Sequence, residues 1–224
     1  MQKILICGFP HSGTSILKSI IGHCEDVEEI YTETNKIHCT TDKKFILAKW
    51  PYIYKKYFDE EYDDYIKIFI IRNPVFIFSS LNKRFNYKIP DDHSIELYID
   101  TVRLFNKYKN TNDNNIYTIR YEDLFQNNYQ NLKNILDNIG ISYTDDIFDN
   151  SKYRNEIIPG CKLLSEKPNN SQHGEYRTWQ INQSFVSNND VSKIDLDTFQ
   201  IETLINNKHI LKIYPDIGID TQSI

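Results

Sequence analysis

The chain has 224 residues, which is long enough to bury the core of one domain. Its 26 basic against 31 acidic residues give a net charge of −5, which excludes a general affinity for nucleic acid or a membrane surface. No apolar run approaches the roughly 18 residues of a transmembrane helix. Because the net charge is negative, any anionic ligand must be held by a local site.

Compartment and metal content follow from the N-terminus, the cysteines and the histidines. A strand pattern begins by residue 3, which leaves no room for a cleavable signal, so we expect a cytoplasmic protein. The four cysteines lack the spacing of metal ligands and are expected to be reduced thiols. The six histidines form no H-x-x-x-H pair, so no metal site is predicted.

The first element is an apolar run at residues 4–7, typical of a buried parallel strand. Gly8 and Gly13 then bracket a tight turn, and a helical pattern starts at Thr14 and ends near Gly22. Free backbone N–H groups and the helix dipole converge at such a junction, which makes a cradle for phosphate. The spacing is that of the P-loop G-x-x-x-x-G-K-[ST], but Thr14 stands where that motif has its lysine.

Strand and helix patterns alternate along the following part of the chain. This alternation predicts an α/β fold of three layers, with a mainly parallel central sheet and helices on both faces, like that of the P-loop NTPases. The further expected strands lie at 45–48, 66–71 and 116–119, and the expected helices lie at 51–62, from Pro74 onward, through 95–105, and at 132–139, where Gly140 ends the helix.

The last third of the chain is less regular. Residues 150–190 are rich in Asn, Ser, Lys, Pro and Gly, and so long an irregular segment in a compact domain is either functional or disordered. The aromatic and basic residues of His173–Trp179 favour function. The final part, about 191–213, is predicted as one helix, with Leu196 and Phe199 on its apolar side, and a short apolar end.

A second anion motif follows the expected strand at 66–71. Arg72 stands at the carboxyl end of that strand, where α/β sheets bind ligands, and its forked donors suit a phosphate. Ser80 lies about two helical turns further on and faces the same side as Arg72 if the helix begins at Pro74. The alternative is that Arg72 pairs with a nearby carboxylate.

Together, these two motifs resemble the sulfotransferase family, whose members use 3′-phosphoadenosine 5′-phosphosulfate (PAPS). In that family a P-[KR]-S-G-T-[TS] loop holds the 5′-phosphosulfate, and an arginine followed eight residues later by a serine holds the 3′-phosphate. The bacterial and tyrosylprotein branch is more similar than the cytosolic branch. The resemblance implies that the first role falls to Pro10, His11, Ser12, Gly13, Thr14 and Ser15, and the second to Arg72 and Ser80.

Two later segments extend the resemblance in the family's order. The segment 119–124, I-R-Y-E-D-L, is similar to the family's R-Y-E-D-L, whose tyrosine helps to hold the nucleotide and here maps onto Tyr121. The segment 174–183 is similar to the family's nucleotide-covering segment, with Arg177 and Trp179 as the implied contacts. Packing in the core is the alternative for Tyr121 and Trp179.

Sulfuryl transfer also requires a base, a cation and the exclusion of water. The resemblance implies that Glu33 is the base, because bacterial and tyrosylprotein enzymes carry a glutamate in this region. A solvated acidic face is the alternative reading of Glu33, and His38 is the reserve base. Lys49, in K-W-P, resembles the family's strand-end lysine that contacts the bridging oxygen.

His11 is the main departure from the family, which has lysine or arginine there to neutralise the sulfuryl group. A bound sulfate and phosphate would favour the charged imidazole and make the enzyme sensitive to pH near neutrality. The alternative is that His11 only forms hydrogen bonds, which leaves Lys49 as the catalytic cation.

The resemblance implies a metal-independent transfer of the sulfuryl group from PAPS to an acceptor hydroxyl, with release of adenosine 3′,5′-bisphosphate. A carbohydrate or a small metabolite is the favoured acceptor, within a single sulfotransferase domain spanning residues 1–224. One alternative is a P-loop kinase of a small metabolite, against which stand the missing loop lysine and Asn73 where an acidic Mg²⁺ ligand is expected. Another is a catalytically degenerate relative that binds a nucleotide.

Overall fold

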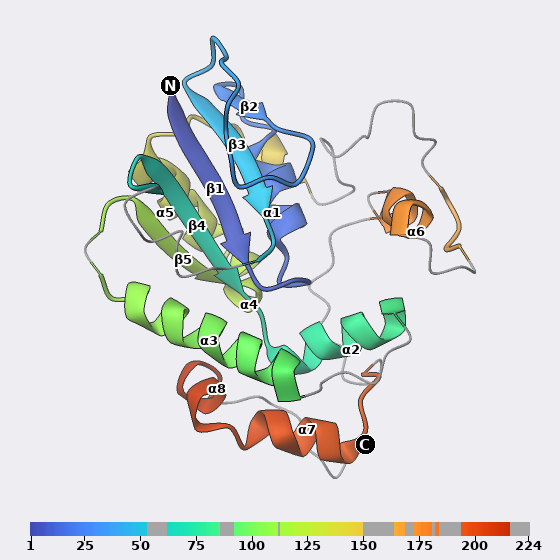
Figure 1. Ribbon diagram of the computed structural model, residues 1–224. Helices are drawn as coiled ribbons and strands as arrows, with labels where there is room; N and C mark the ends of the chain where they lie inside the picture. Colours follow the sequence, from blue (N-terminus) through green and yellow to red (C-terminus); the bar gives the residue numbers. More distant parts are fainter. Residues whose placement is uncertain are drawn as a thin grey trace.

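The computed structural model describes residues 1–52, 62–85, 92–111, 113–149, 164–168, 173–180, 182–183 and 194–215. In these residues one sheet has the order β2-β3-β1-β4-β5, and every neighbouring pair of strands is parallel (Figure 1). The carboxyl ends of all the strands therefore meet at one edge. The strands are β1 (Gln2–Gly8), β2 (Val27–Glu29), β3 (Phe45–Trp50), β4 (Tyr65–Ile71) and β5 (Ile116–Arg120).

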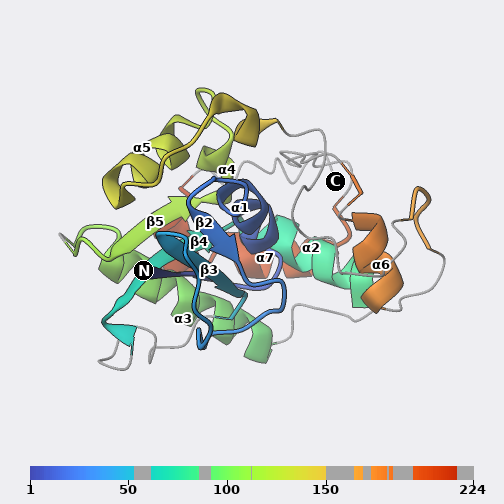
Figure 2. The same cartoon turned by 90° about the horizontal axis from the view of Figure 1, so that it is seen from above.

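Helices cover both faces of this sheet, which confirms the predicted α/β class with three layers (Figures 1 and 2). One face carries α1 (Thr14–Ile21), α4 (Tyr121–Leu124), α5 (Gln130–Ile139) and the 3₁₀ helix η3 (Asp145–Phe148). The other face carries α2 (Pro74–Phe85) and α3 (Asp92–Tyr108), which α7 (Thr198–Ile205) and α8 (Lys208–Ile213) cover from outside. α6 (His173–Gln180) lies apart from the sheet in both views.

The strands form because their sequences suit a sheet that is covered on both faces. All seven residues of β4 are buried, and in β3 five of six are, so neither strand shows an alternation of polar and apolar residues. The predicted strands at 4–7, 45–48, 66–71 and 116–119 are confirmed to within two residues at each end. The helices predicted from Pro74 and through 95–105 are also confirmed.

Two elements differ from the predicted secondary structure, and one predicted helix lies mostly outside the described residues. β2 was not predicted, because it has three residues, V-E-E, at the edge of the sheet. α6 lies in the stretch predicted to be irregular. Of the helix predicted at 51–62, residues 53–61 lie outside the described residues.

The predicted single helix at about 191–213 is two helices. Asn207 interrupts it, because its side chain accepts hydrogen bonds from the N–H groups of His209 and Ile210 and so begins α8. Phe199 was predicted on the buried side but is 77% exposed, whereas Ile201 and Leu204 are buried. The capping box between Asp197 and Gln200 fixes where α7 begins.

The end of α5 follows the prediction at Gly140. This residue has φ +80°, the left-handed conformation that glycine adopts without a steric penalty. Its N–H and that of Ile141 donate to the carbonyl of Leu136 and thereby close the helix. The Lys44 ammonium donates to the Gly140 carbonyl at 2.8 Å, which ties the end of α5 to the start of β3.

We predict that Gly140→Ala lowers the free energy of unfolding by about 1–2 kcal/mol, because an L-residue is strained at this φ. Urea denaturation measures the loss. Gly140→Asn is the matched variant and is expected to cost less, since asparagine tolerates the left-handed region. Equal losses in the two variants would contradict the conformational explanation.

Candidate functional site

The loop between β1 and α1 passes close to two neighbouring elements, and its two glycines make this approach sterically allowed. A side chain at Gly8 would collide with the carbonyl of Ile70 in β4. The backbone of Gly13 has φ +97°, and a side chain there would collide with the Tyr121 ring. The Ser12 hydroxyl donates to the same Ile70 carbonyl at 3.2 Å, which fixes the loop against the sheet.

The loop leads into the N-terminus of α1 in a form suited to an anion. Gly13 is the N-cap residue, so no capping side chain accepts from the first-turn N–H groups, and no acidic residue lies in that turn. His11 also has a left-handed backbone, with φ 66°. Left-handed residues on both sides of Ser12 curl the backbone so that its N–H groups can converge on one anion. Pro10 is half-buried at the start of this turn.

A cation reaches this loop from each of the two strands that flank β1. Lys49 is the penultimate residue of β3, is buried, and donates to the Ser15 hydroxyl at 2.6 Å. Arg72 follows β4 directly, and its Nη1 donates to the His11 carbonyl at 3.5 Å. The guanidinium carbon of Arg72 lies 4.3 Å from the centroid of the Tyr121 ring. The loop therefore has a lysine on one side and an arginine on the other.

The structure brings Ser80 to the arginine side of the loop, in agreement with the spacing argument. α2 begins at Pro74, and Ser80 Oγ lies 2.7 Å from Nδ1 of His11. Arg72, Ser80 and His11 thus form one cluster, whereas Lys49 and Ser15 form another. The imidazole of His11 belongs to the first cluster in this arrangement.

Glu33 lies beside Lys49. Its carboxylate is 3.1 Å from the Lys49 ammonium, and the side chain is 51% exposed, whereas that of the lysine is buried. The N–H of Thr34 donates to the carbonyl of Lys49 at 3.0 Å, so the segment that carries Glu33 is attached to the end of β3. A carboxylate and an ammonium group therefore face each other next to the phosphate-type loop.

His38 is held elsewhere along the same connection. The N–H of Ile37 donates to the Tyr65 hydroxyl at 3.1 Å. Tyr65 is the first residue of β4. It therefore lies at the amino ends of the strands, whereas the loop lies at their carboxyl ends. His38 itself is exposed. The described contacts bring Glu33, and not His38, to Lys49.

A buried ion pair that the sequence analysis missed links α1 to the segment of Glu33. Lys18 is 1% exposed, and its ammonium lies 2.9 Å from Glu29 at the end of β2. The same ammonium donates to the carbonyl of Tyr31 at 3.2 Å, two residues before Glu33. Glu29 is therefore not part of a solvated acidic face. No sequence signal marked it, because Glu29 is a charged residue that shares the buried face of a three-residue strand with Val27.

We predict that Lys18→Met lowers the free energy of unfolding by about 3–5 kcal/mol, because it leaves the Glu29 carboxylate buried without its cation. The double variant Lys18→Met/Glu29→Leu is expected to recover most of this loss, since it removes both charges. Urea denaturation of the three proteins measures both effects. A double variant as unstable as the single one would show that packing, and not the uncompensated charge, sets the cost.

The remaining predicted residues divide into two groups. Tyr121 is buried, and its ring lies under the guanidinium of Arg72 and packs edge-on against Phe125; burial raises the pKa of its hydroxyl. It is thus both a core aromatic and a neighbour of the site. Trp179 of α6 has described contacts with Tyr176 and Gln183, not with the loop. The side chain of Arg177 lies outside the described residues.

The described ranges also bear on metal binding and on membrane insertion. Within these ranges, no three His, Cys, Asp or Glu side chains gather closely enough to hold a metal ion. The helices of the same ranges include none with the length and apolar character to cross a membrane.

The comparisons with known proteins give similarities among solved structures alone, since no family model and no curated protein matches the chain. One similar structure is the mouse sulfotransferase SULT7A1 complexed with PAP, at 20% identity over 66% of this chain and 61% of that one, with a TM-score of 0.49. Another is retinol dehydratase in complex with androsterone and inactive cofactor PAP, at 12% identity, 66% and 63% coverage, and a TM-score of 0.45.

A third similar structure is the sulfotransferase domain from the curacin biosynthetic pathway, at 10% identity over 98% of each chain, with a TM-score of 0.49. This chain spans less than two thirds of the length of the first two structures. Two of the three are named as sulfotransferases, and two hold PAP.

Proposed function

We propose that this protein is a PAPS-dependent sulfotransferase. The observation that carries the proposal is the pair of clusters on either side of one loop: Arg72 with Ser80 and His11 on one side, and Lys49 with Glu33 on the other. PAPS has a phosphate on the 3′ oxygen of its ribose and a phosphosulfate on the 5′ oxygen. A protein that holds both needs two separate cationic positions around one nucleotide.

The residues of the loop suit the 5′ end of such a nucleotide. The N–H groups from Gly13 to Ser15, at the start of α1, would hold the 5′-phosphate, with no need for a loop lysine; the N–H of Ser12 already donates to the carbonyl of Phe9 at 3.1 Å. Arg72 and Ser80 would hold the 3′-phosphate, the arginine through its forked donors. His11 is hydrogen-bonded to Ser80, which favours a role for its imidazole on this side and leaves Lys49 as the cation nearest to the transferring group.

The chemistry would take place at Glu33 and Lys49. In the proposed reaction, the Glu33 carboxylate takes the proton from the acceptor hydroxyl, whose oxygen forms a bond to sulfur. The bond from sulfur to the 5′-phosphate breaks, and its electron pair stays on the phosphate oxygen, where Lys49 stabilises the charge. Acceptor and leaving oxygens flank the same sulfur atom, so base and cation have to be close, and their separation of 3.1 Å is compatible with this.

Two strand ends distinguish this proposal from a P-loop kinase. A kinase of that class holds Mg²⁺ through the loop hydroxyl and an acidic residue at a strand end. The strands that flank β1 lead into Lys49 and Trp50 on one side and Arg72 and Asn73 on the other. The Asn73 side chain is buried and accepts from the N–H of Val75, so it acts as a cap of α2.

The acceptor remains part of the proposal, as a hydroxyl of a carbohydrate or a small metabolite. The proposal also treats residues 1–224 as one sulfotransferase domain, with the segment at about 150–190 covering the nucleotide. Arg177 and Trp179 stay predicted nucleotide contacts from that segment.

We predict that adenosine 3′,5′-bisphosphate stabilises the protein more than AMP or ADP does, because Arg72 and Ser80 bind its 3′-phosphate. A ligand at a hundred times its Kd stabilises by about 2.7 kcal/mol, which a thermal shift detects readily. Arg72→Ala should abolish the preference for the 3′-phosphate. Arg103→Ala is the matched control, since this arginine lies exposed on α3 and pairs with Asp100. A wild-type protein without the preference would remove the basis for the proposal.

We predict that Glu33→Gln lowers the rate of sulfuryl transfer by about 10²–10⁴-fold, the usual contribution of a general base. His38→Gln is the matched control and should retain the wild-type rate, because His38 is exposed and its neighbour Ile37 is held by Tyr65. Release of adenosine 3′,5′-bisphosphate from PAPS, followed over a panel of hydroxylated acceptors, measures the rate.

A large loss of rate in His38→Gln, with Glu33→Gln at the wild-type rate, would assign the base to His38. A wild-type protein that binds the bisphosphate but releases none with any acceptor would instead identify a degenerate relative. ADP formed from ATP in a Mg²⁺-dependent reaction would favour the kinase.

A further inference from the structure

The peptide unit that follows Arg72 is held at both of its polar groups by side chains. Its C=O belongs to Arg72 and accepts from the Tyr98 hydroxyl at 2.6 Å. Its N–H belongs to Asn73 and donates to the Glu122 carboxylate at 2.8 Å. Because a peptide unit is planar, these two bonds together fix its orientation and so restrict ψ of Arg72. The arginine therefore leaves β4 in a defined direction.

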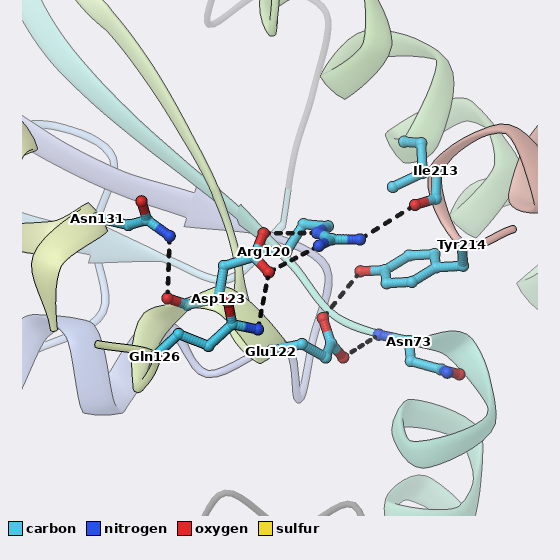
Figure 3. A network of polar contacts seen from close by, with 8 residues as sticks. All are labelled: Asn73, Arg120, Glu122, Asp123, Gln126, Asn131, Ile213 and Tyr214. Carbon is cyan, nitrogen blue, oxygen red and sulfur yellow. Dashed lines mark hydrogen bonds and ion pairs between the residues drawn. The ribbon is translucent and has the colours of Figure 1, made fainter. Parts of the chain in front are cut away.

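Glu122 is the centre of a polar network that joins three parts of the fold (Figure 3). One oxygen of its carboxylate accepts from the N–H of Asn73, and the other accepts from the Tyr214 hydroxyl at 3.3 Å. Desolvation raises the pKa of Glu122, and the hydrogen bond from Asn73 and the charges of Arg72 and Arg120 oppose this shift. The hydrogen bond from Asn73 and the two arginine charges thus offset part of the cost of holding this carboxylate away from water.

The two tyrosines complete the enclosure of this peptide unit. Tyr98 comes from α3 and Tyr214 follows α8, and both side chains are buried. Burial raises the pKa of each phenol well above its ordinary value, so both remain protonated donors. Glu122, Tyr98 and Tyr214 therefore form one connected set around the end of β4.

The same short segment also orients the side chain of Arg72. Tyr121, directly before Glu122, lies under the guanidinium with 4.3 Å between its ring centroid and the guanidinium carbon. Tyr121 thus supports the charged end of the arginine while Glu122 fixes its backbone. Tyr121 and Glu122, the first two residues of α4, therefore act on the same arginine. Tyr121 contacts its guanidinium, and Glu122 accepts from the N–H of the peptide unit that follows it.

We propose that Glu122 and Tyr98 are positioning residues for Arg72 and thereby determine how strongly the protein prefers a nucleotide with a 3′-phosphate. This inference rests on the proposed function, in which Arg72 binds that phosphate. An arginine distinguishes ligands with a 3′-phosphate from ligands without one only when its guanidinium is held in a fixed direction. A mobile guanidinium forms hydrogen bonds to water as readily as to phosphate.

A purely structural role for Glu122 is the competing explanation, and the chain offers a matched control for it. Asp123, the next residue of α4, accepts two bonds from Arg120 at 2.6 and 2.7 Å, and Arg120 in turn donates to the carbonyl of Ile213 (Figure 3). This second link also ties α4 and β5 to the end of α8. Its described contacts do not include the peptide unit after Arg72.

The experiment compares Glu122→Leu, Asp123→Leu and Glu122→Gln with the wild type, with isothermal titration of adenosine 3′,5′-bisphosphate and of AMP. We expect Glu122→Leu to lower the ratio of the two affinities by at least about fivefold, the equivalent of one hydrogen bond. Asp123→Leu should leave the ratio unchanged. Glu122→Gln should also preserve it, because the amide oxygen still accepts from the N–H of Asn73.

Tyr98→Phe is the second variant and decides the question if Glu122→Leu does not fold. It removes one hydroxyl, keeps the packed ring, and should lower the same ratio. If the ratio of the two affinities is unchanged and the binding of both nucleotides is weakened equally, Glu122 and Tyr98 act on stability alone. This result would overturn the inference. Such a result leaves the proposed function intact, whereas a wild-type protein without any preference for the bisphosphate overturns both.

Discussion

The parallel register of β1 with β3 and β4 is the constraint on which the site depends. Ile6 lies opposite Lys49, and Gly8 lies opposite Ile70, so the loop leaves β1 at the level where both neighbouring strands end. A shift of one residue in β3 would turn Lys49 to the other face and away from Ser15. The two cations meet the loop because the backbone hydrogen bonds of the sheet align the three strands. This alignment does not depend on the side-chain contacts within the site.

Much of the fold could be predicted because its signals are local. The apolar runs of β1 and β4, Pro74 at the start of α2 and Gly140 at the end of α5 act within a few residues of themselves. The loop was also predictable, since its glycines and its strand-to-helix context are adjacent in the sequence. The separation of α7 from α8 was less visible, because apolar residues continue on both sides and one capping asparagine makes the break.

The contacts that set the chemistry of the site were not predictable, because their partners are distant in sequence. Glu122 and Tyr214 are 92 residues apart, and no periodicity connects them. Which of Glu33 and His38 lies beside Lys49 also depends on tertiary structure, through the ion pair of Glu33 and the bond from Ile37 to Tyr65. Sequence motifs indicated which residues to consider, whereas packing decided which of them stand next to each other.

The place of Tyr214 near the end of the described chain has a consequence for synthesis. A nascent chain that has emerged as far as β5 already contains the loop, Lys49 and Arg72, and domains begin to fold while synthesis continues. The hydroxyl that supports Glu122 is added almost a hundred residues later. Because a domain generally folds as a unit, the contact of Tyr214 with Glu122 forms only once the C-terminal helices have been synthesised and have packed onto the sheet.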